Sequence, residues 1–234
     1  MEDYRREKTK WELGRKIEVF KRSEIFGHLD RRALEEIASC AVLVRFKKDS
    51  YIFRDGDESL FFYIIDNGLI KLYKGSSTGK NFTISISTNS DTLNASALSI
   101  DRHFMTAQAI TVVTTLRIEK RDFFVFLNKY PSISVQIIKK LAERLSAEYQ
   151  KIVDITGEEV EQRIINSLFA LSSKFGPVLR IKREELADFS GITTETTIRV
   201  LSKLKKKGII SNSTVRGKII ISDMERLQAL SFYP

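Results

Sequence analysis

The side chains with the most specific chemistry gather within seven positions, from Thr193 to Arg199. An arginine can donate a fork of hydrogen bonds to guanine O6 and N7, and a glutamate can accept from the cytosine amino group. A carboxylate is poorly suited to contact phosphates, which are themselves negative. Glu195 and Arg199 therefore indicate contact with base edges. The ordinary alternative is an ion pair along a solvated helix face, worth about 0.2–0.5 kcal/mol.

Two helices joined at Gly191 would position these side chains. Glycine permits the left-handed turn between the helices of a helix-turn-helix, and Thr193 supplies an N-cap oxygen for the second helix. The apolar positions that would face the core are Leu186, Ala187, Ile192, Val200, Leu201 and Leu204. The exposed N-terminal face of the second helix is then free to enter a major groove.

Base reading is expected from Thr194, Glu195, Ile198 and Arg199. If Glu195 and Arg199 share one G·C pair, Ile198 discriminates only by apolar contact, and the thymine methyl group is the one such feature in the major groove. We therefore expect a half-site in which a T·A pair adjoins the G·C pair.

Contacts to the DNA backbone are expected from Lys182, Arg183, Lys206 and Arg216. Arg216 falls near the turn of a predicted hairpin over residues 209–221, which would form the wing of a winged helix-turn-helix. The chain carries 39 Lys and Arg against 30 Asp and Glu, a formal net charge of +9. This balance favours an anionic partner, although charge alone does not separate DNA from a membrane.

The first half of the chain has a different texture. Apolar repeats predict helices over residues 2–21 and 29–41, and short β-rich runs broken by turns follow from Val42 to Ile118. The glycines at 56, 68 and 79 are interpreted as ordinary hairpin turns. The expected fold is α+β, with a β-roll in residues 1–130, a long helix in 131–157 and the winged helix-turn-helix in 158–234.

An apolar stripe runs along the helix that begins at Pro131, through Ile138, Leu141, Leu145, Tyr149 and Ile152. Its spacing of three and four residues suits a two-helix seam, so we expect a homodimer. The alternative is that the stripe packs on its own β-roll. A two-fold dimer would bind a palindromic operator whose half-sites lie one helical turn apart, ~34 Å.

Over residues 24–232 the chain resembles the cyclic AMP receptor protein/fumarate-nitrate regulator (CRP/FNR) superfamily. The most specific match is the stretch from Gly191 to Leu201, which looks like the family's recognition helix. The resemblance implies that Glu195 and Arg199 read a G·C pair, that Thr193 and Thr196 lie near phosphates, and that RNA polymerase is a partner. It also implies an effector in the β-roll. The cyclic AMP-binding members have an arginine at the position of Thr194 and read a TGTGA type of half-site, so we expect a half-site closer to TTGA here.

The family's cyclic-nucleotide pocket is not reproduced in this sequence. In the family, a Phe-x-Gly-Glu turn and an Arg-Ser pair hold the nucleotide, and positions on the long helix meet the purine. The corresponding residues in this sequence are Asn94, Ala95, His103, Phe104, Glu148 and Tyr149. A buried phosphate without its arginine would be strongly disfavoured. The effector pocket is therefore expected among these residues, with an effector other than cyclic AMP.

Cofactors are restricted by the count of one cysteine, Cys40, which we interpret as a small core residue. An iron–sulfur cluster needs several cysteines and is not expected. Haem stays open, and the protein would then sense NO or CO. His103 is the best candidate ligand, its ordinary interpretation being a partly exposed loop histidine; His28 is weaker. A third alternative is a regulator that needs no effector.

Other classes of protein are less consistent with the sequence. It contains no nucleophile elbow, no phosphate-cradling Gly-Lys-Ser/Thr loop and no cluster with metal-ligand spacing, so no enzyme is expected. An architectural DNA binder would need only the positive charge, and Glu195 opposes it. Apolar runs fall short of the ~20 residues of a membrane span, and residues 1–6 do not resemble a secretory signal. We expect a cytoplasmic protein.

Overall fold

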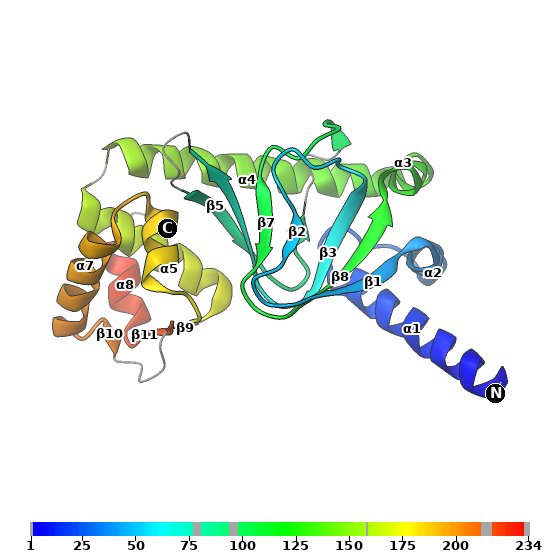
Figure 1. The fold of residues 1–234 in the computed structure, drawn as a ribbon, viewed down its shortest axis with the longest axis horizontal. Coiled ribbons are helices and arrows are strands. Elements are labelled where there is room, and N and C mark those ends of the chain that lie inside the picture. Colours follow the sequence, from blue (N-terminus) through cyan, green and yellow to red (C-terminus); the bar gives the residue numbers. More distant parts are fainter. Residues whose placement is uncertain (1, 77–80, 94–97, 158, 212–216, 232–234) are drawn as a thin grey trace. The chain divides into compact units, whose positions relative to one another are not determined.

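The computed structural model describes the whole chain except residues 1, 77–80, 94–97, 158, 212–216 and 232–234. It divides into two compact units (Figure 1). The first unit comprises Met1–Gly75 and Ile84–Leu145, and the second comprises Ser76–Thr83 and Ser146–Pro234. The expected α+β architecture is confirmed, with a β-roll, a long helix and a winged helix-turn-helix.

The β-roll consists of two four-stranded antiparallel sheets. Their orders are β1-β8-β3-β6 and β2-β7-β4-β5. The strands are β1 (Val42–Phe46), β2 (Tyr51–Phe53), β3 (Phe61–Asn67), β4 (Ile70–Gly75), β5 (Asn81–Ser87), β6 (Thr92–Leu93), β7 (Thr106–Ala109) and β8 (Val113–Glu119). Three helices flank the roll in sequence: α1 (Glu2–Arg22), α2 (Arg31–Cys40) and α3 (Lys120–Lys129).

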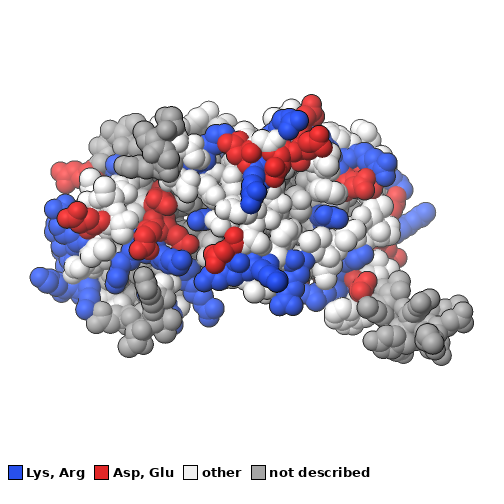
Figure 2. Space-filling model, viewed as in Figure 1, with Lys and Arg blue, Asp and Glu red and all other residues white. Residues whose placement is uncertain are grey.

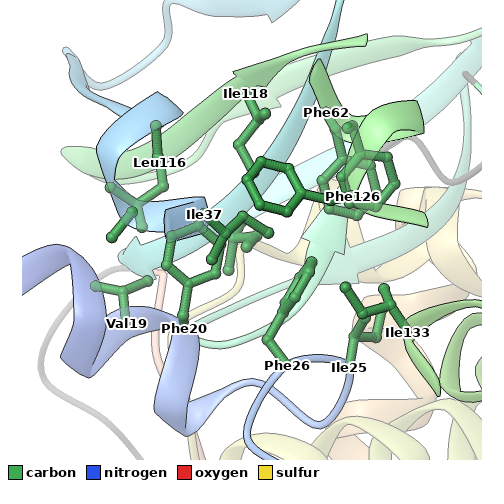
Figure 3. Packing of buried hydrophobic residues seen from close by; sticks show 14 of the residues in the cluster. Val19, Phe20, Ile25, Phe26, Ile37, Phe62, Leu116, Ile118, Phe126 and Ile133 are labelled. Atoms are coloured by element: carbon green, nitrogen blue, oxygen red, sulfur yellow. The ribbon is translucent and has the colours of Figure 1, made fainter. Parts of the chain in front are cut away.

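Successive side chains of a strand point to opposite faces, so β3 and β8 serve two cores. Phe62 of β3 packs with Phe26 in the cluster formed with the helices (Figure 3). The ring of Phe62 also stacks on that of Phe123, with centroids 4.1 Å apart. Tyr63 and Ile65, on the opposite face of β3, belong to the interior of the roll. The alternation read from the sequence therefore separates a helix-facing core from a roll interior.

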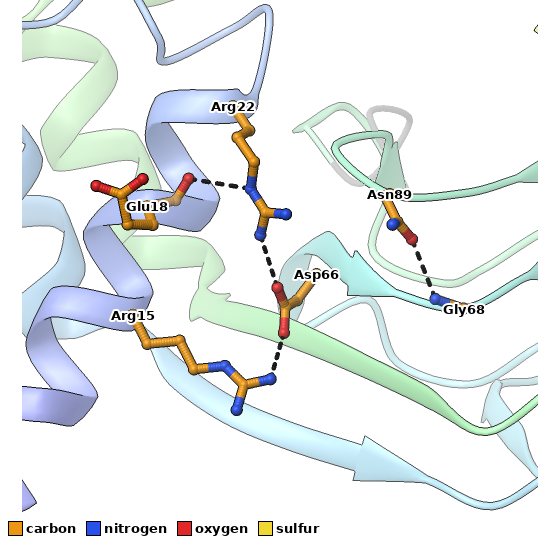
Figure 4. A network of polar contacts seen from close by, with 6 residues as sticks. All are labelled: Arg15, Glu18, Arg22, Asp66, Gly68 and Asn89. Carbon is orange, nitrogen blue, oxygen red and sulfur yellow. Dashed lines mark hydrogen bonds and ion pairs between the residues drawn. The ribbon is translucent and has the colours of Figure 1, made fainter.

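Asp66 fastens α1 to the roll (Figure 4). Its carboxylate oxygens accept hydrogen bonds from Arg15 Nη2 at 2.7 Å and Arg22 Nη2 at 2.8 Å, while its own side chain is 7% exposed. A buried carboxylate needs such partners because an unpaired buried charge is strongly unfavourable.

Nearby, Gly68 has a φ of 107°, and a Cβ there would lie 2.5 Å from the carbonyl oxygen of Val112. The interpretation of this glycine as a turn residue is confirmed.

Helix α4 (Pro131–Gly157) begins at the predicted proline and is followed by α5 (Val160–Phe175). The second unit continues with β9 (Val178–Leu179), α6 (Arg183–Ser190), α7 (Thr194–Lys206), β10 (Ile210–Ser211), β11 (Ile219–Ile221) and α8 (Met224–Leu230). Strands β10, β11 and β9 form a small antiparallel sheet in that order. No helix in the described part of the chain has the length and apolar character needed to cross a bilayer.

The structure departs from the sequence interpretation at several points. Helices α3 and α8 were not predicted, because α3 follows β8 without a turn signal and α8 is only one to two turns long. Cys40 is exposed at the last position of α2, so its interpretation as a core residue was wrong. The apolar segment around it buries Ile37 and Ala38 instead. The predicted turn at Gly79 lies outside the described residues.

Candidate nucleic-acid interface

Helices α6 and α7 meet at Gly191 as predicted. Gly191 adopts a left-handed conformation (φ 64°, ψ 39°), and its N–H donates to the last turn of α6. The Thr193 side chain then caps α7 by accepting from the N–H of Thr196 at 3.3 Å. The short link between the two helices is therefore fixed at both ends by local hydrogen bonds.

The predicted packing face of this motif is confirmed. Leu186 and Ala187 are buried on α6, Ile192 is half-buried, and α7 buries Thr197, Val200, Leu201 and Leu204. The opposite face of α7 remains open to solvent. On it lie Glu195, Ile198 and Arg199, all exposed, with Thr194 half-buried beside them.

Glu195 and Arg199 do not neutralise each other in this conformation. Neither side chain makes an ion pair or a hydrogen bond with another described residue. The alternative of a Glu195–Arg199 ion pair along the helix is therefore not what this structure contains. An acid and a base, both free and one helical turn apart, present an acceptor and a fork of donors to whatever approaches the face.

The expected backbone-contact residues that the structure describes lie on or next to α6 and α7. Lys182 and Arg183 are exposed at the start of α6, where the Lys182 N–H donates to the Glu185 carboxylate at 2.8 Å. Lys206 is exposed at the end of α7, and Thr196 is half-buried in its first turn. In the view of Figure 2, Lys and Arg side chains lie on the surface near α7, with acidic side chains among them. Arg216 lies outside the described residues, so the wing contact stays a prediction.

The sequence interpretation missed the residues that hold α7 in place. Glu161, at the start of α5, pairs with Lys203 at 2.7 Å and with Lys207 at 3.5 Å, near the C-terminal end of α7. These ion pairs lower the pKa of Glu161. Of the four lysines at the end of α7 and just after it, Lys203, Lys205, Lys206 and Lys207, two are thus paired within the protein. The signal that could have found Glu161 is an acidic residue opening an otherwise apolar helix.

The apolar stripe of α4 is exposed in the single chain. Its five predicted members, Ile138, Leu141, Leu145, Tyr149 and Ile152, have exposed fractions between 42% and 65%. Isolated exposed apolar side chains are ordinary, whereas a continuous row on one helix marks an interaction surface. Ile133 and Ile137, on another side of the same helix, are buried in the helix-facing core. One helix therefore serves both the core and a second, uncovered face.

The candidate effector residues are distributed over both units. Asn94 and Ala95 lie outside the described residues. In the first unit Phe104 is exposed and His103 is buried, at 4% exposure. Glu148, half-buried, and Tyr149, exposed, lie on the part of α4 that belongs to the second unit.

His103 is not the partly exposed loop histidine that the sequence suggested. Its ring stacks on Phe53 with centroids 3.7 Å apart and planes 4° apart, and its backbone bonds to Gly56 and Asp57. Burial lowers the pKa of His103, opposed by the nearby Asp57 carboxylate. Nδ1 of His103 is buried and has no hydrogen-bond partner, and Phe53 covers one face of the ring.

The roll interior contains further polar groups that the sequence did not single out. Thr115 is fully buried and its Oγ1 has no hydrogen-bond partner. Two residues on, Arg117 lies over the ring of Phe61 at 4.5 Å, opposite Tyr63 in the strand register. Burial raises the pKa of Tyr63, and the Arg117 charge acts against that rise. Within the described residues, no group of three or more acidic, histidine or cysteine side chains is placed to hold a metal ion.

Two protein families match the chain, one in its first half and one in its second half. Residues 43–130 match the cyclic nucleotide-binding domain, and residues 162–230 match the Crp-like helix-turn-helix domain. These ranges contain most of the β-roll and nearly all of the helix-turn-helix unit. The order along the chain is thus a cyclic-nucleotide-type domain followed by a DNA-binding domain.

Curated relatives extend over nearly the whole chain. The nitrogen fixation regulation protein FixK of Bradyrhizobium diazoefficiens is 26% identical over 217 residues, which are 89% of this chain and 90% of the relative. A CRP-like cAMP-activated global transcriptional regulator of Mycobacterium tuberculosis is 26% identical over 220 residues, 90% of this chain and 97% of the relative. Both are similar to this chain in length.

Solved structures support the same fold. FixK2 from Bradyrhizobium japonicum superimposes with a TM-score of 0.74 at 20% identity, covering 83% of this chain and 98% of that one. A CooA mutant from Carboxydothermus hydrogenoformans gives a TM-score of 0.67 at 19% identity, covering 82% and 88%. At this level of identity the likeness concerns the fold alone.

Proposed function

Because the chain belongs to the CRP/FNR superfamily of transcription regulators, we propose that it binds palindromic operators as a homodimer and reads their sequence with α7. It is a DNA-binding regulator with an effector-type β-roll domain. We further propose RNA polymerase as a partner, the cytoplasm as its location, and no catalytic activity.

The observation that carries base reading is the pair of free charges on α7. Glu195 and Arg199 are exposed, have no partner among the described residues and stand on a helix capped by Thr193. A protein that bound only phosphates would gain nothing from Glu195 on its groove-facing helix, because the carboxylate repels them. With Thr194 and Ile198 beside them, these side chains support a half-site close to TTGA.

Selection from randomised duplexes tests this proposal. We expect an enriched palindrome with TTGA-type half-sites, and a ratio of specific to non-specific affinity of about 10³ or more at one fixed salt concentration. Recovery of no preferred sequence, with equal affinity for all duplexes, would show that the protein is a general DNA binder.

The exposed stripe of α4 supports the homodimer. A second copy of the same helix would cover Leu141, Leu145 and Tyr149 and so remove a continuous apolar row from water. A two-fold dimer would also carry two recognition helices, as binding to a palindrome with half-sites ~34 Å apart requires. Sedimentation of the purified protein checks the oligomeric state directly.

For the effector, we propose a molecule other than cyclic AMP. His103 and Phe104 occupy the stations of the family's phosphate-binding Arg-Ser pair, and one is packed against Phe53 while the other is exposed. Neither can replace the bidentate contact of an arginine with a phosphate. Titration calorimetry with cyclic AMP should give no heat of binding. Micromolar binding with a matching rise in operator affinity would refute this part of the proposal.

A regulator that needs no effector is the second candidate. The stack of His103 on Phe53 shows side chains of the protein itself filling part of the roll interior. In that case operator affinity of protein refolded without small molecules equals that of protein purified directly. A loss of affinity on refolding, restored by a host extract passed through a small-pore filter, would favour an effector instead.

A further inference from the structure

The turn between α6 and α7 is held by an arginine from a third helix. Arg163, half-buried in the first turn of α5, donates from Nε and Nη2 to the carbonyl oxygen of Ser190 at 3.1 and 2.7 Å. Its Nη2 also donates to the carbonyl oxygen of Gly191 at 2.6 Å. The last carbonyls of a helix lack partners within the helix and carry partial negative charge, so a guanidinium is well suited to them.

Two hydroxyl groups add further hydrogen bonds between the end of α6 and α5. The Ser190 hydroxyl, buried, donates to Ser167 Oγ at 2.8 Å, and the Ser167 hydroxyl donates to the carbonyl oxygen of Arg163 at 2.7 Å. Side chain and backbone of Arg163 thus take part in one ring of hydrogen bonds with the end of α6. Such a ring fixes both the distance and the rotation of the turn relative to α5.

The position of the turn sets the position of the base-reading side chains. Gly191 is two residues before Thr193, the cap of α7, and Thr194 and Glu195 follow at once. The other end of α7 is tied to α5 through Glu161, which pairs with Lys203. Neighbouring residues of α5 therefore hold α7 near both of its ends. Only the Arg163 contact lies beside the end that enters the groove.

We propose that Arg163 is a positioning residue for DNA recognition: it touches no base, and it fixes where the recognition helix begins. The proposal rests on the proposed function, since it concerns the same helix. A shift of about 1 Å at the start of α7 would misplace all its base contacts together, because hydrogen bonds depend steeply on distance and angle. Loss of Arg163 should therefore weaken every base preference at once.

The test compares Arg163→Ala with wild type on the selected operator and on a random duplex at one salt concentration. We expect cognate affinity to fall about tenfold or more, in line with charge-assisted hydrogen bonds, while affinity for the random duplex changes by less than about twofold. Selection with the variant should give weaker preference at every position of the half-site. Arg199→Ala, in contrast, should relax preference mainly at one guanine.

Two further variants separate positioning from charge and from folding. Arg226→Ala removes the same charge and one hydrogen bond to a backbone carbonyl, that of Lys207 at 3.1 Å, so it should change the specificity ratio by less than about twofold. Arg163→Lys keeps the charge without the planar fork and should fall between wild type and Arg163→Ala. Should Arg163→Ala fail to fold, Arg163→Lys carries the test, with faster amide exchange expected at Thr196 and Thr197.

The outcomes are distinct. If the Arg163 variants lose cognate and random affinity equally and keep the wild-type base preferences, Arg163 contributes only charge or stability and the inference is refuted. If wild type itself shows no base preference, the proposed function fails and the positioning role fails with it. Reduced preference at a single position would also refute the inference, because it would make Arg163 a local contact.

Discussion

The two units place their polar side chains in opposite surroundings. On α7, Glu195 and Arg199 are exposed, whereas inside the β-roll His103 and Thr115 are buried and each leaves one polar atom without a hydrogen-bond partner. An exposed polar group is satisfied by water, while a buried unsatisfied one costs about 1–3 kcal/mol. The DNA-facing surface is therefore ready before a partner arrives. The roll interior carries a cost that a rearrangement or a bound molecule can relieve.

The largest expected effect concerns the helix that both units share. Replacing Leu141 and Leu145 together by Glu should give monomers, since four charges would meet at the proposed seam. Operator affinity should then fall about 10²–10⁴-fold, because the second half-site no longer binds as an intramolecular event. Sedimentation and operator titration measure both results.

A control for the seam is Lys139→Glu, which changes the charge of the same helix by an equal amount on an exposed side chain away from the stripe. It should leave the dimer intact. If the Leu141/Leu145 variant stayed dimeric, the dimer interface would lie elsewhere, and α4 would not be the element that brings two DNA-binding units together.

The next largest effect is expected at α7, where the exposed charge of Arg199 is available to a partner. Arg199→Ala should cost about 1–3 kcal/mol at the cognate site and relax the preference at one guanine, because the fork of donors to O6 and N7 is lost. Binding to randomised duplexes, counted by sequencing, gives both quantities. An equal loss for every sequence would make Arg199 a phosphate contact.

A smaller effect should separate the lysines of α7. Lys206 is exposed, so Lys206→Ala should weaken all sequences alike and reduce the slope of log affinity against log salt by about 0.9. Lys203 is paired with Glu161, so Lys203→Ala should change that slope less. Titrations over a series of salt concentrations provide the test. Equal slopes for the two variants would contradict the assignment of Lys203 to an internal ion pair.

The DNA-binding unit was the more predictable part because its signals are local. Gly191 needs a left-handed turn and Thr193 caps the helix that follows, so both could be placed from neighbouring residues alone. The contact of Arg163 with Ser190 joins positions 27 residues apart, and no local pattern announces it. Long-range contacts of this kind depend on how helices pack, which periodicity does not specify.

The β-roll was predicted as a fold but less well as a site. Alternation gave its strands, whereas the environment of His103 depends on its stack with Phe53, fifty residues earlier in the chain. Cys40 failed for a related reason: an apolar neighbourhood in sequence does not show which face of the helix a residue occupies. Its exposure follows from its place at the end of α2.

The smallest expected effect tests the buried histidine. Burial lowers the pKa of His103 below its ordinary value of 6.5, so the folded protein binds the proton less readily than the unfolded chain. The stabilisation from its neutral form is therefore present above pH 6.5 and is lost as the pH falls below it. In thermal melts between about pH 8 and pH 5, wild type should lose stability more steeply than His103→Phe, which keeps the stacked ring on Phe53 and has no titrating nitrogen.

The chain has two histidines, and His28→Ala supplies the matched control because His28 is exposed and bonded to Ser132. That variant should keep the wild-type pH response. If His103→Phe kept it as well, the acid sensitivity would belong to carboxylates, and the contrast between a polar roll interior and an open DNA-facing surface would lose its energetic basis.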